Sequence, residues 1–265
     1  MKRTITFIAS LTAYCLAGFV FAEAKVTEMP DWQNPQIVER NRLPMRAHFE
    51  TDGLKQTLNG VWDFKWYETV GARSAEFFRT DFDASEWDRM PVPGMWELNG
   101  YGDPVYVNVG YPWRGHYRNN PPFPSDWHNY AGQYRRTFTL DEEWKGKDII
   151  LHIGAASSNV RVWVNGKEVG YSEDSKLEAR FDITKFVKTG ENLIALEIFR
   201  WCDGSYLEDQ DFWRLTGISR DVYVFSREKA RVEDIRVVAS ASGEVKIETE
   251  MTKGVGSVRY ALYDA

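Results

Sequence analysis

The fold class of this chain is decided by one stretch, Asn159-Val160-Arg161-Val162-Trp163-Val164-Asn165-Gly166-Lys167-Glu168-Val169-Gly170-Tyr171. Asn165-Gly166 separates two segments that have the composition and length of β-strands. Both central residues of a tight hairpin turn need positive φ angles, and Asn and Gly tolerate them. The stretch therefore predicts a hairpin of two antiparallel strands, Asn159 to Val164 and Lys167 to Tyr171.

Similar segments lie on both sides of this hairpin. From Val61 to Tyr67, three aromatic rings alternate with Asp63 and Lys65, which is the period of a half-buried strand. Further strands are expected at Gln133 to Leu140, Asp148 to Ile153, Asn192 to Arg200 and Arg220 to Phe225. Regular strands without intervening helical periods predict an all-β fold, a jelly-roll β-sandwich over residues 58–226.

Two segments flank the predicted sandwich. Residues 23–57 contain Pro30, Pro35 and Pro44 without a sustained period, so they are expected to form an extended arm that docks on another part of the protein. Residues 227–265 predict the start of a second β-domain, with strands at Val232 to Ala239, Glu244 to Met251 and Ser257 to Tyr263. Three strands cannot close a sandwich, so we expect the chain to be a piece of a longer protein.

The first 22 residues have the pattern of a secretory signal peptide. Lys2 and Arg3 precede an apolar stretch from Ile5 to Phe21, and cleavage is expected after Ala22 or Ala24. A transmembrane anchor is the weaker interpretation because polar residues and a glycine interrupt a short stretch. We therefore expect an exported protein, periplasmic or extracellular. Cleavage would leave Cys202 as the single cysteine, so no intrachain disulfide could form.

Composition narrows the class of ligand. The net charge is −6, and we find no clustered basic surface of the kind that binds nucleic acid or anionic membrane. No membrane partner is expected after signal cleavage. Aromatic residues make up 15% of the chain, with 11 Trp, which suits a ring-rich sandwich core or a sugar-stacking surface. A neutral ligand is the expected partner.

The run from Arg200 to Arg214 places four carboxylates and four aromatic rings between two predicted strands, the acids being Asp203, Glu208, Asp209 and Asp211. Carboxylates accept hydrogen bonds from hydroxyls or bind hard cations, and rings stack on the apolar faces of sugars. The loop therefore indicates carbohydrate. Two alternatives stay open: nearby arginines could simply neutralise the acids, and Asp209 with Asp211 could form a glycosidase pair. The second is disfavoured because arginines would lower both pKa values.

A second candidate lies in the proline-rich, aperiodic segment from Pro91 to Tyr130, which is expected to be functional or poorly ordered. Asn108 stands there among aromatic rings, and its amide can both donate to and accept from a sugar hydroxyl. A turn residue that caps local backbone is an equal alternative. The four histidines are scattered, and no zinc or nucleophile motif is found.

Several ordered motifs together resemble one family. They are Asp31-Trp32-Gln33-Asn34-Pro35 with Asn41-Arg42, Leu58-Asn59-Gly60-Val61-Trp62, Pro91-Val92-Pro93-Gly94-Met95-Trp96, Gly100-Tyr101-Gly102-Asp103-Pro104-Val105-Tyr106, Asn108-Val109-Gly110-Tyr111-Pro112 and the acidic loop. From about residue 30 onward the chain resembles the N-terminal region of family 2 glycoside hydrolases, and within them the β-galactosidases. That family places an immunoglobulin-like sandwich after the jelly roll, so residues 227–265 would be its incomplete start.

The resemblance also implies a chemistry. A retaining β-galactosidase uses two glutamates of a TIM barrel that lies beyond this chain, so the fragment alone is expected to be inactive. Asn108 matches the family's substrate-contacting asparagine, and Asp211 matches the acid that contacts the galactosyl group and ligates sodium. The family's magnesium is held by barrel residues outside this chain. The segment from Trp113 to Tyr130 departs from the family by extra aromatic and basic residues.

Two further function classes compete with this interpretation. The same loop and rings would suit a stand-alone carbohydrate-binding module. The arm at residues 23–57 resembles the segment through which the family's tetramers form, so an assembly role in a homo-oligomer is the third hypothesis. Under the leading hypothesis, the partners are a β-galactoside and the remaining domains of the same enzyme.

Overall fold

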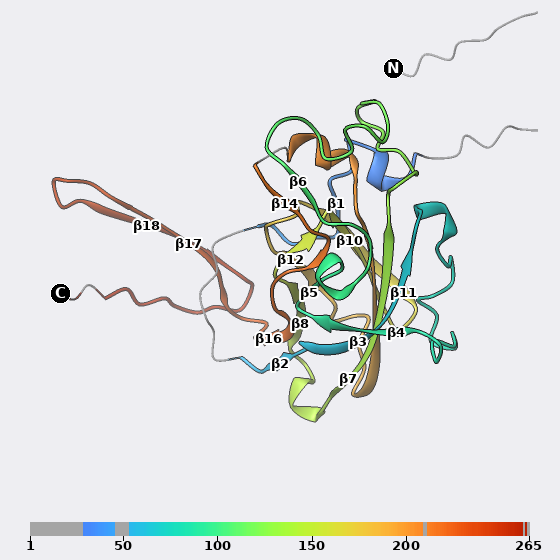
Figure 1. Cartoon of the computed structure of the whole chain (residues 1–265). Coiled ribbons are helices and arrows are strands. Elements are labelled where there is room, and N and C mark those ends of the chain that lie inside the picture. Colours follow the sequence, from blue (N-terminus) through green and yellow to red (C-terminus); the bar gives the residue numbers. More distant parts are fainter. Residues whose placement is uncertain (1–28, 46–52, 209–210, 262, 264–265) are drawn as a thin grey trace, which may run out of the picture.

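The computed structural model describes residues 29–45, 53–208, 211–261 and 263 (Figure 1). Over these ranges the chain is built from strands and short 3-10 turns, and it contains no α-helix. No helix long and apolar enough to cross a membrane is found in this part of the chain. The predicted signal peptide at residues 1–22 lies outside the described residues. The all-β prediction is confirmed.

The larger sheet of the sandwich has seven strands. Their order across the sheet is β1 (Glu39–Arg40), β11 (Lys167–Glu173), β10 (Asn159–Val164), β13 (Gly190–Phe199), β7 (Ala131–Leu140), β3 (Gly60–Tyr67) and β4 (Asp88–Val92). All neighbours in this sheet pair antiparallel. The hairpin predicted from Asn165-Gly166 is β10–β11, and the two residues have φ angles of 49° and 78°. The fold-deciding stretch therefore forms the structure that its turn chemistry requires.

The smaller sheet closes the sandwich and has four antiparallel strands, in the order β12 (Ala179–Asp182), β8 (Asp148–Ile153), β16 (Val222–Arg227) and β2 (Lys55–Thr57). One large apolar cluster fills the space between the sheets. Trp62 and Phe64 of β3 are fully buried in it, as the alternation from Val61 to Tyr67 predicts. The Trp62 indole donates to Leu58 O at 2.8 Å, which satisfies its buried N–H.

Close packing at the end of this core involves a glycine. A Cβ on Gly132 in β7 would lie 2.2 Å from Trp96 Cζ2 and 2.9 Å from Phe64 Cε2. Only a hydrogen fits at this position, so the Trp96 ring can lie against the strand backbone. The Trp96 backbone N–H also donates to Thr216 O at 2.8 Å. Trp96 therefore connects the main core to the loops that carry the candidate site.

The arm docks on the sandwich. Its first element is η1 (Asp31–Gln33), and β1 then pairs with β11 at the sheet edge. Asp31 is buried and accepts two hydrogen bonds of 2.8 Å from Arg40 and one of 2.6 Å from Arg161. Burial alone would raise the pKa of Asp31, but the two guanidinium groups outweigh it and lower the pKa. The arm is thus attached by ion pairs as well as by strand pairing.

Residues 91–130, predicted as aperiodic, contain more structure than expected. β5 (Gly94–Met95) joins β15 (Gly217–Ile218) and β9 (Ala156–Ser157) in a three-stranded sheet, and β6 (Val105–Val107) pairs with β14 (Phe212–Arg214). η3 (Glu97–Asn99) lies between β5 and β6, and the other short turns are η2 (Val70–Ala72), η4 (Glu142–Trp144) and η5 (Asp203–Leu207). Two- and three-residue strands are too short to show a period, which explains the miss.

Beyond the sandwich, β17 (Val232–Ala239) and β18 (Val245–Met251) form a two-stranded ribbon that extends away from it (Figure 1). Both strands agree with the prediction. The third predicted strand, Ser257 to Tyr263, is wrong: residues 257–261 and 263 are not paired. Alternating side chains form a strand only where a partner strand supplies hydrogen bonds. Among the described residues, no strand pairs with this segment.

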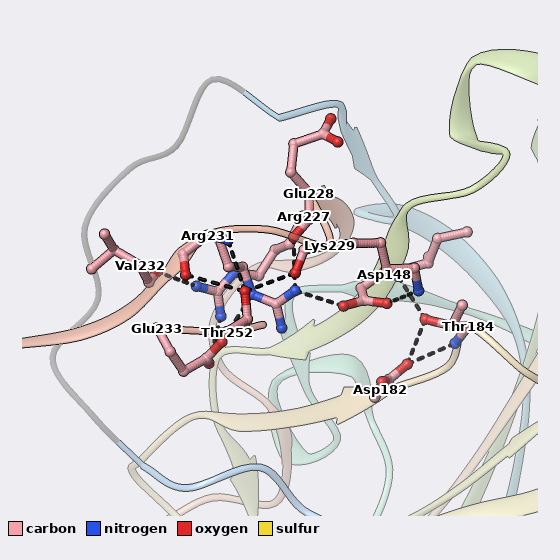
Figure 2. Close-up of polar contacts among 11 residues, drawn as sticks. Asp148, Asp182, Thr184, Arg227, Glu228, Lys229, Arg231, Val232, Glu233 and Thr252 are labelled. Carbon is pink, nitrogen blue, oxygen red and sulfur yellow. Dashed lines mark hydrogen bonds and ion pairs between the residues drawn. The ribbon is translucent and has the colours of Figure 1, made fainter. Parts of the chain in front are cut away.

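A polar cluster joins the ribbon to the sandwich, as Figure 2 shows. Asp148 begins β8, and its carboxylate accepts hydrogen bonds from Lys229 and, at 2.6 Å, from Arg231. Glu233 in β17 accepts from Arg231 and from Arg227, both at 2.8 Å. Arg231 therefore bridges a carboxylate of the sandwich and a carboxylate of the ribbon.

Candidate sugar and cation site

Asn108 and Asp211 are brought together by the β6–β14 ribbon. The paired residues are Val105 with Arg214, Tyr106 with Trp213 and Val107 with Phe212. Asn108 directly follows the last paired residue of β6, and Asp211 directly precedes the first paired residue of β14. Because the strands are antiparallel, both residues lie at the same end of the ribbon. Both are exposed, so an amide and a carboxylate face solvent together.

The Asp211 carboxylate has one fixed oxygen. Oδ1 accepts a hydrogen bond of 2.6 Å from the Tyr106 hydroxyl, and within the described ranges no other hydrogen bond to this carboxylate is recorded. For Asn108, the described part of the chain shows no hydrogen bond of the side-chain amide, so the alternative of a local backbone cap gains no support. Both side chains thus keep capacity to bind a hydroxyl group.

The remaining acids of the loop have other surroundings. Glu208 accepts hydrogen bonds from Ser175 N at 2.8 Å and Ser175 Oγ at 2.5 Å, which ties the loop to the end of β11. Asp203 is buried, and Asp209 lies outside the described residues, so the hypothesis of a glycosidase pair with Asp211 is not tested. The three described acids have separate partners: Glu208 binds Ser175, Asp203 lies beside Glu173, and Asp211 binds Tyr106. Asp211 is the described acid of the loop that faces solvent with a free oxygen.

Arg200 and Arg220 bind groups outside the acidic loop. In the described residues, these two arginines therefore do not neutralise the acids of the loop. Arg200 is buried and donates to Asp103 Oδ1 at 3.0 Å and to Asp103 O at 2.8 Å. Its guanidinium also lies 4.7 Å from the centre of the Tyr130 ring. Arg220 donates to Lys176 O at 2.9 Å. Arg200 therefore fixes the start of β6 relative to the end of β13.

A separate aromatic cluster, here called the loop core, lies between the loops that carry Asn108 and Asp211. Its buried members are Trp113, Trp201 and Tyr206, and Tyr111 and Tyr117 pack against them. The rings of Tyr111 and Tyr117 both stack on the Trp113 ring, at centroid distances of 5.1 and 5.6 Å. The loop core joins the Pro91 to Tyr130 segment to the acidic loop. Two of the four rings of the acidic loop, Trp201 and Tyr206, are thus core residues. Large aromatic side chains are commonly buried, so this agrees with a ring-rich core.

Two polar side chains, the buried Asn129 and the half-buried Glu97, secure the ends of the acidic loop. Asn129 accepts from Trp201 N at 2.8 Å and donates to Trp201 O at 3.0 Å, so it pairs with the backbone as a strand would. Glu97 accepts from Thr216 N and from Thr216 Oγ1, both at 2.8 Å. Burial raises the pKa of Glu97 although the hydrogen bonds from Thr216 oppose it. Both residues hold the backbone that carries Asp211.

One group could hold a metal ion. Glu173 of β11, Cys202 and Asp203 are buried, and their ligand atoms all lie within 4.8 Å of one another. A Cβ on Gly204 would lie 2.8 Å from Glu173 Oε2, so glycine leaves the space that this carboxylate occupies. Burial raises the pKa of Glu173 to about 8, and burial also raises the pKa of Asp203. Such raised values fit either a shared proton or a cation that replaces it.

Sequence reasoning missed this buried group. Asp203 was included among the acids of the loop, but its partner Glu173 belongs to a distant strand and stands in no motif. The available signal was Asp203-Gly204, because a glycine beside a carboxylate can mark a close approach by another group. That signal is too general to identify Glu173.

Comparisons with known proteins identify the family of this chain. Residues 55–228 match the family model described as "Glycosyl hydrolases family 2, sugar binding domain". The chain is 41% identical over 250 residues to a β-galactosidase of Priestia megaterium, covering 89% of this chain and 24% of that protein. It is 37% identical over 254 residues to a β-galactosidase of Vibrio cholerae, again covering 89% and 24%. The chain thus spans about a quarter of the length of these curated relatives.

A solved structure shows the same fold. A Faecalibacterium prausnitzii β-glucuronidase superposes with a TM-score of 0.56 at 15% identity, covering 79% of this chain and 37% of that chain. At this identity the likeness concerns the fold alone.

Proposed function

The chain belongs to the sugar-binding domain family of glycosyl hydrolases family 2, and from this membership we propose that it is the N-terminal sugar-binding part of an exported β-galactosidase. The whole enzyme would hydrolyse terminal β-D-galactosides with retention of configuration. The curated β-galactosidases that match 89% of the chain support the choice of galactoside.

One observation carries the proposal. Two residues from distant loops, Asn108 and Asp211, lie at the same end of the exposed β6–β14 ribbon. An amide that donates and accepts and a carboxylate with a free oxygen are groups that recognise adjacent hydroxyls of a pyranose. The main core needs neither of them. Their position suits a wall that contacts substrate while another domain performs the chemistry.

Catalysis is assigned to a part of the enzyme outside these residues. In the proposed mechanism two glutamates of a TIM barrel act as acid/base and nucleophile, the arrangement of retaining glycosidases. The described residues form sandwich and ribbon, and this chain would supply substrate contacts. We also propose that the barrel residues hold the magnesium ion of the full enzyme.

Sodium is the cation proposed for Asp211. A carboxylate oxygen suits a hard cation, and the free oxygen of Asp211 could supply one ligand. A hard cation needs several oxygen ligands, so the others would come from the remaining domains or from substrate. Bound sodium would supply positive charge that orients a sugar hydroxyl at Asp211.

Export and assembly complete the proposal. The apolar stretch after Lys2 and Arg3 supports a signal peptide and a periplasmic or extracellular location. The arm docks on its own sandwich through β1, and its exposed parts are proposed to contribute to a homo-oligomer. Light scattering of the full-length gene product tests the last point, and a monomer would contradict it.

The deciding experiment compares the full-length gene product with its Asp211→Asn variant. Hydrolysis of lactose should be measured across sodium concentrations, and proton NMR should follow the anomer of galactose that forms first. We expect the variant to lose sodium activation and to raise KM, since a cation ligand and an anionic acceptor are lost. Identical sodium profiles for the two proteins would refute the role of Asp211.

A stand-alone carbohydrate-binding module remains the second candidate. It is favoured by the complete apolar core between the two sheets and by the exposed Trp213 ring, which is 56% accessible. Calorimetry of this chain with lactose distinguishes the candidates. Measurable heat with no hydrolysis by the full-length gene product would support the module.

A further inference from the structure

The hydroxyl of Tyr106 and the carboxylate of Asp211 form a short, isolated hydrogen bond. Its length of 2.6 Å lies within the range of an O–H donor to an ionised oxygen. Within the described residues this is the one hydrogen bond recorded for either side chain.

The strand register explains why these two groups meet. Tyr106 is paired with Trp213 across the ribbon, so the two side chains lie on the same face. Asp211 precedes Trp213 by two residues, and side chains two apart on an extended segment point to the same side. The phenol therefore reaches diagonally across the ribbon to the carboxylate. The rings of Tyr106 and Trp213 are 5.6 Å apart at 50°, which restricts how far the phenol can swing.

This arrangement contributes little to folding. Tyr106 and Trp213 are 53% and 56% exposed, and Asp211 is exposed as well. A hydrogen bond between solvent-exposed groups stabilises a fold weakly because water replaces either partner. Its effect is geometric: the terminal torsion of an aspartate is broad, and a donor on Oδ1 selects one orientation. The other oxygen is then held toward solvent, where a cation or a hydroxyl can reach it.

We infer that Tyr106 is a positioning residue for Asp211, fixing one carboxylate oxygen so that the other is presented to the galactoside and to sodium. The inference rests on the proposed function, because it takes Asp211 as the residue that contacts both. Tyr106 ends the Gly100–Tyr106 motif, and the hydroxyl of this exposed side chain gains a role that the motif alone does not assign.

The test replaces Tyr106 by Phe in the full-length gene product, which removes the hydroxyl and keeps the ring. We expect KM for lactose and the sodium concentration for half-maximal activation each to rise about fivefold to tenfold, the effect of losing one orienting hydrogen bond. The midpoint of thermal unfolding should not change. Tyr263→Phe is the matched control, since Tyr263 is 85% exposed and lies beyond the ribbon β17–β18.

A double-mutant cycle with Asp211→Ala distinguishes the positioning role of Tyr106 from the binding role of Asp211. If Tyr106 acts through Asp211, then Tyr106→Phe adds nothing in the Asp211→Ala background. Equal effects in both backgrounds, or unchanged KM and sodium activation in Tyr106→Phe alone, overturn the positioning role. If Asp211→Ala itself leaves both parameters unchanged, the proposed function of Asp211 fails, and the positioning role fails with it.

Discussion

Arg231 donates a hydrogen bond of 2.6 Å to Asp148, and this contact links the ribbon β17–β18 to the first residue of β8. The side chains of Asp148 and Arg231 are 16% and 19% exposed, so this ion pair is partly shielded from water, whereas Lys229 is 60% exposed. Asp148→Asn should lower the free energy of unfolding by about 1–2 kcal/mol, because an uncharged amide cannot balance Lys229 and Arg231. Urea denaturation measures this change. Glu244→Gln, an exposed change in the turn between β17 and β18, is the comparison.

The same junction should weaken in acid. Burial pushes the pKa of Asp148 upward, but Lys229 and Arg231 outweigh it, so the pKa lies below its ordinary value. A lowered carboxyl pKa stabilises the fold above the unfolded value of about 3.9, and the contribution is lost as pH falls through the folded value. Limited proteolysis between pH 7 and 3 should show cleavage near the start of β17 only at the acid end. Equal cleavage at all pH values would contradict this.

The buried Glu173 should make stability depend on pH in the opposite direction, because its pKa is raised and not lowered. Burial raises its pKa from the ordinary 4.5 to about 8, with the hydrogen bond and charge of Asp203 adding to the rise. The folded state then binds more protons than the unfolded state between these values, so the free energy of unfolding falls as pH rises through that window. Glu173→Gln cannot ionise and should flatten the pH profile of urea denaturation. Glu244→Gln, an exposed change, should leave the wild-type slope intact.

Gly132 should not tolerate a methyl group. An alanine Cβ would lie 2.2 Å from Trp96 Cζ2, and Trp96 is fully buried and cannot move without displacing the small sheet of β5 and β15. Gly132→Ala should therefore cost about 3 kcal/mol of stability. Gly256→Ala is the control, since nothing lies within 4 Å of its Cβ position. A Gly132→Ala variant as stable as the control would show that the core yields more easily than the contacts indicate.

Asn129 should control the order of the acidic loop. It is fully buried, and its amide satisfies both backbone groups of Trp201. Asn129→Ala leaves a buried N–H and a buried C=O without partners and should cost about 2–4 kcal/mol. Hydrogen exchange at Trp201 would accelerate, while amides of β10 would stay protected. Asn129→Asp keeps the acceptor and should protect Trp201 N–H better than alanine does.

The sequence predicts the long strands well because period and turn chemistry act locally. Asn165-Gly166 and the alternation at Trp62 and Phe64 are examples in which neighbouring residues decide both the strand and its buried face. The third strand at Ser257 to Tyr263 failed because pairing needs a partner that local sequence does not describe. Strands such as β6 and β14 were missed because three residues cannot display a period.

The individual residues of the candidate site could be predicted from the sequence, but their proximity could not. Asn108 and Asp211 each stood out by residue type and by the family motifs, and the site roles given to them stay predictions. Their shared position depends on the β6–β14 register, which joins segments about a hundred residues apart. Tyr106 and Glu173 act through distant partners in the same way. A chemical role that depends on tertiary contacts is not visible in a single local window.

The loop core has a consequence for heat sensitivity. Its rings, Trp113, Trp201 and Tyr206, form a cluster distinct from the one between the sheets. Groups that contact each other more than the rest of a protein can open as a cooperative unit while the remainder stays folded. The wall that carries Asp211 would then have a melting equilibrium of its own. On warming, the loops that carry Asp211 would then open before the sandwich unfolds, because Trp201 and Tyr206 pack edge-on against Trp113 in a cluster of their own.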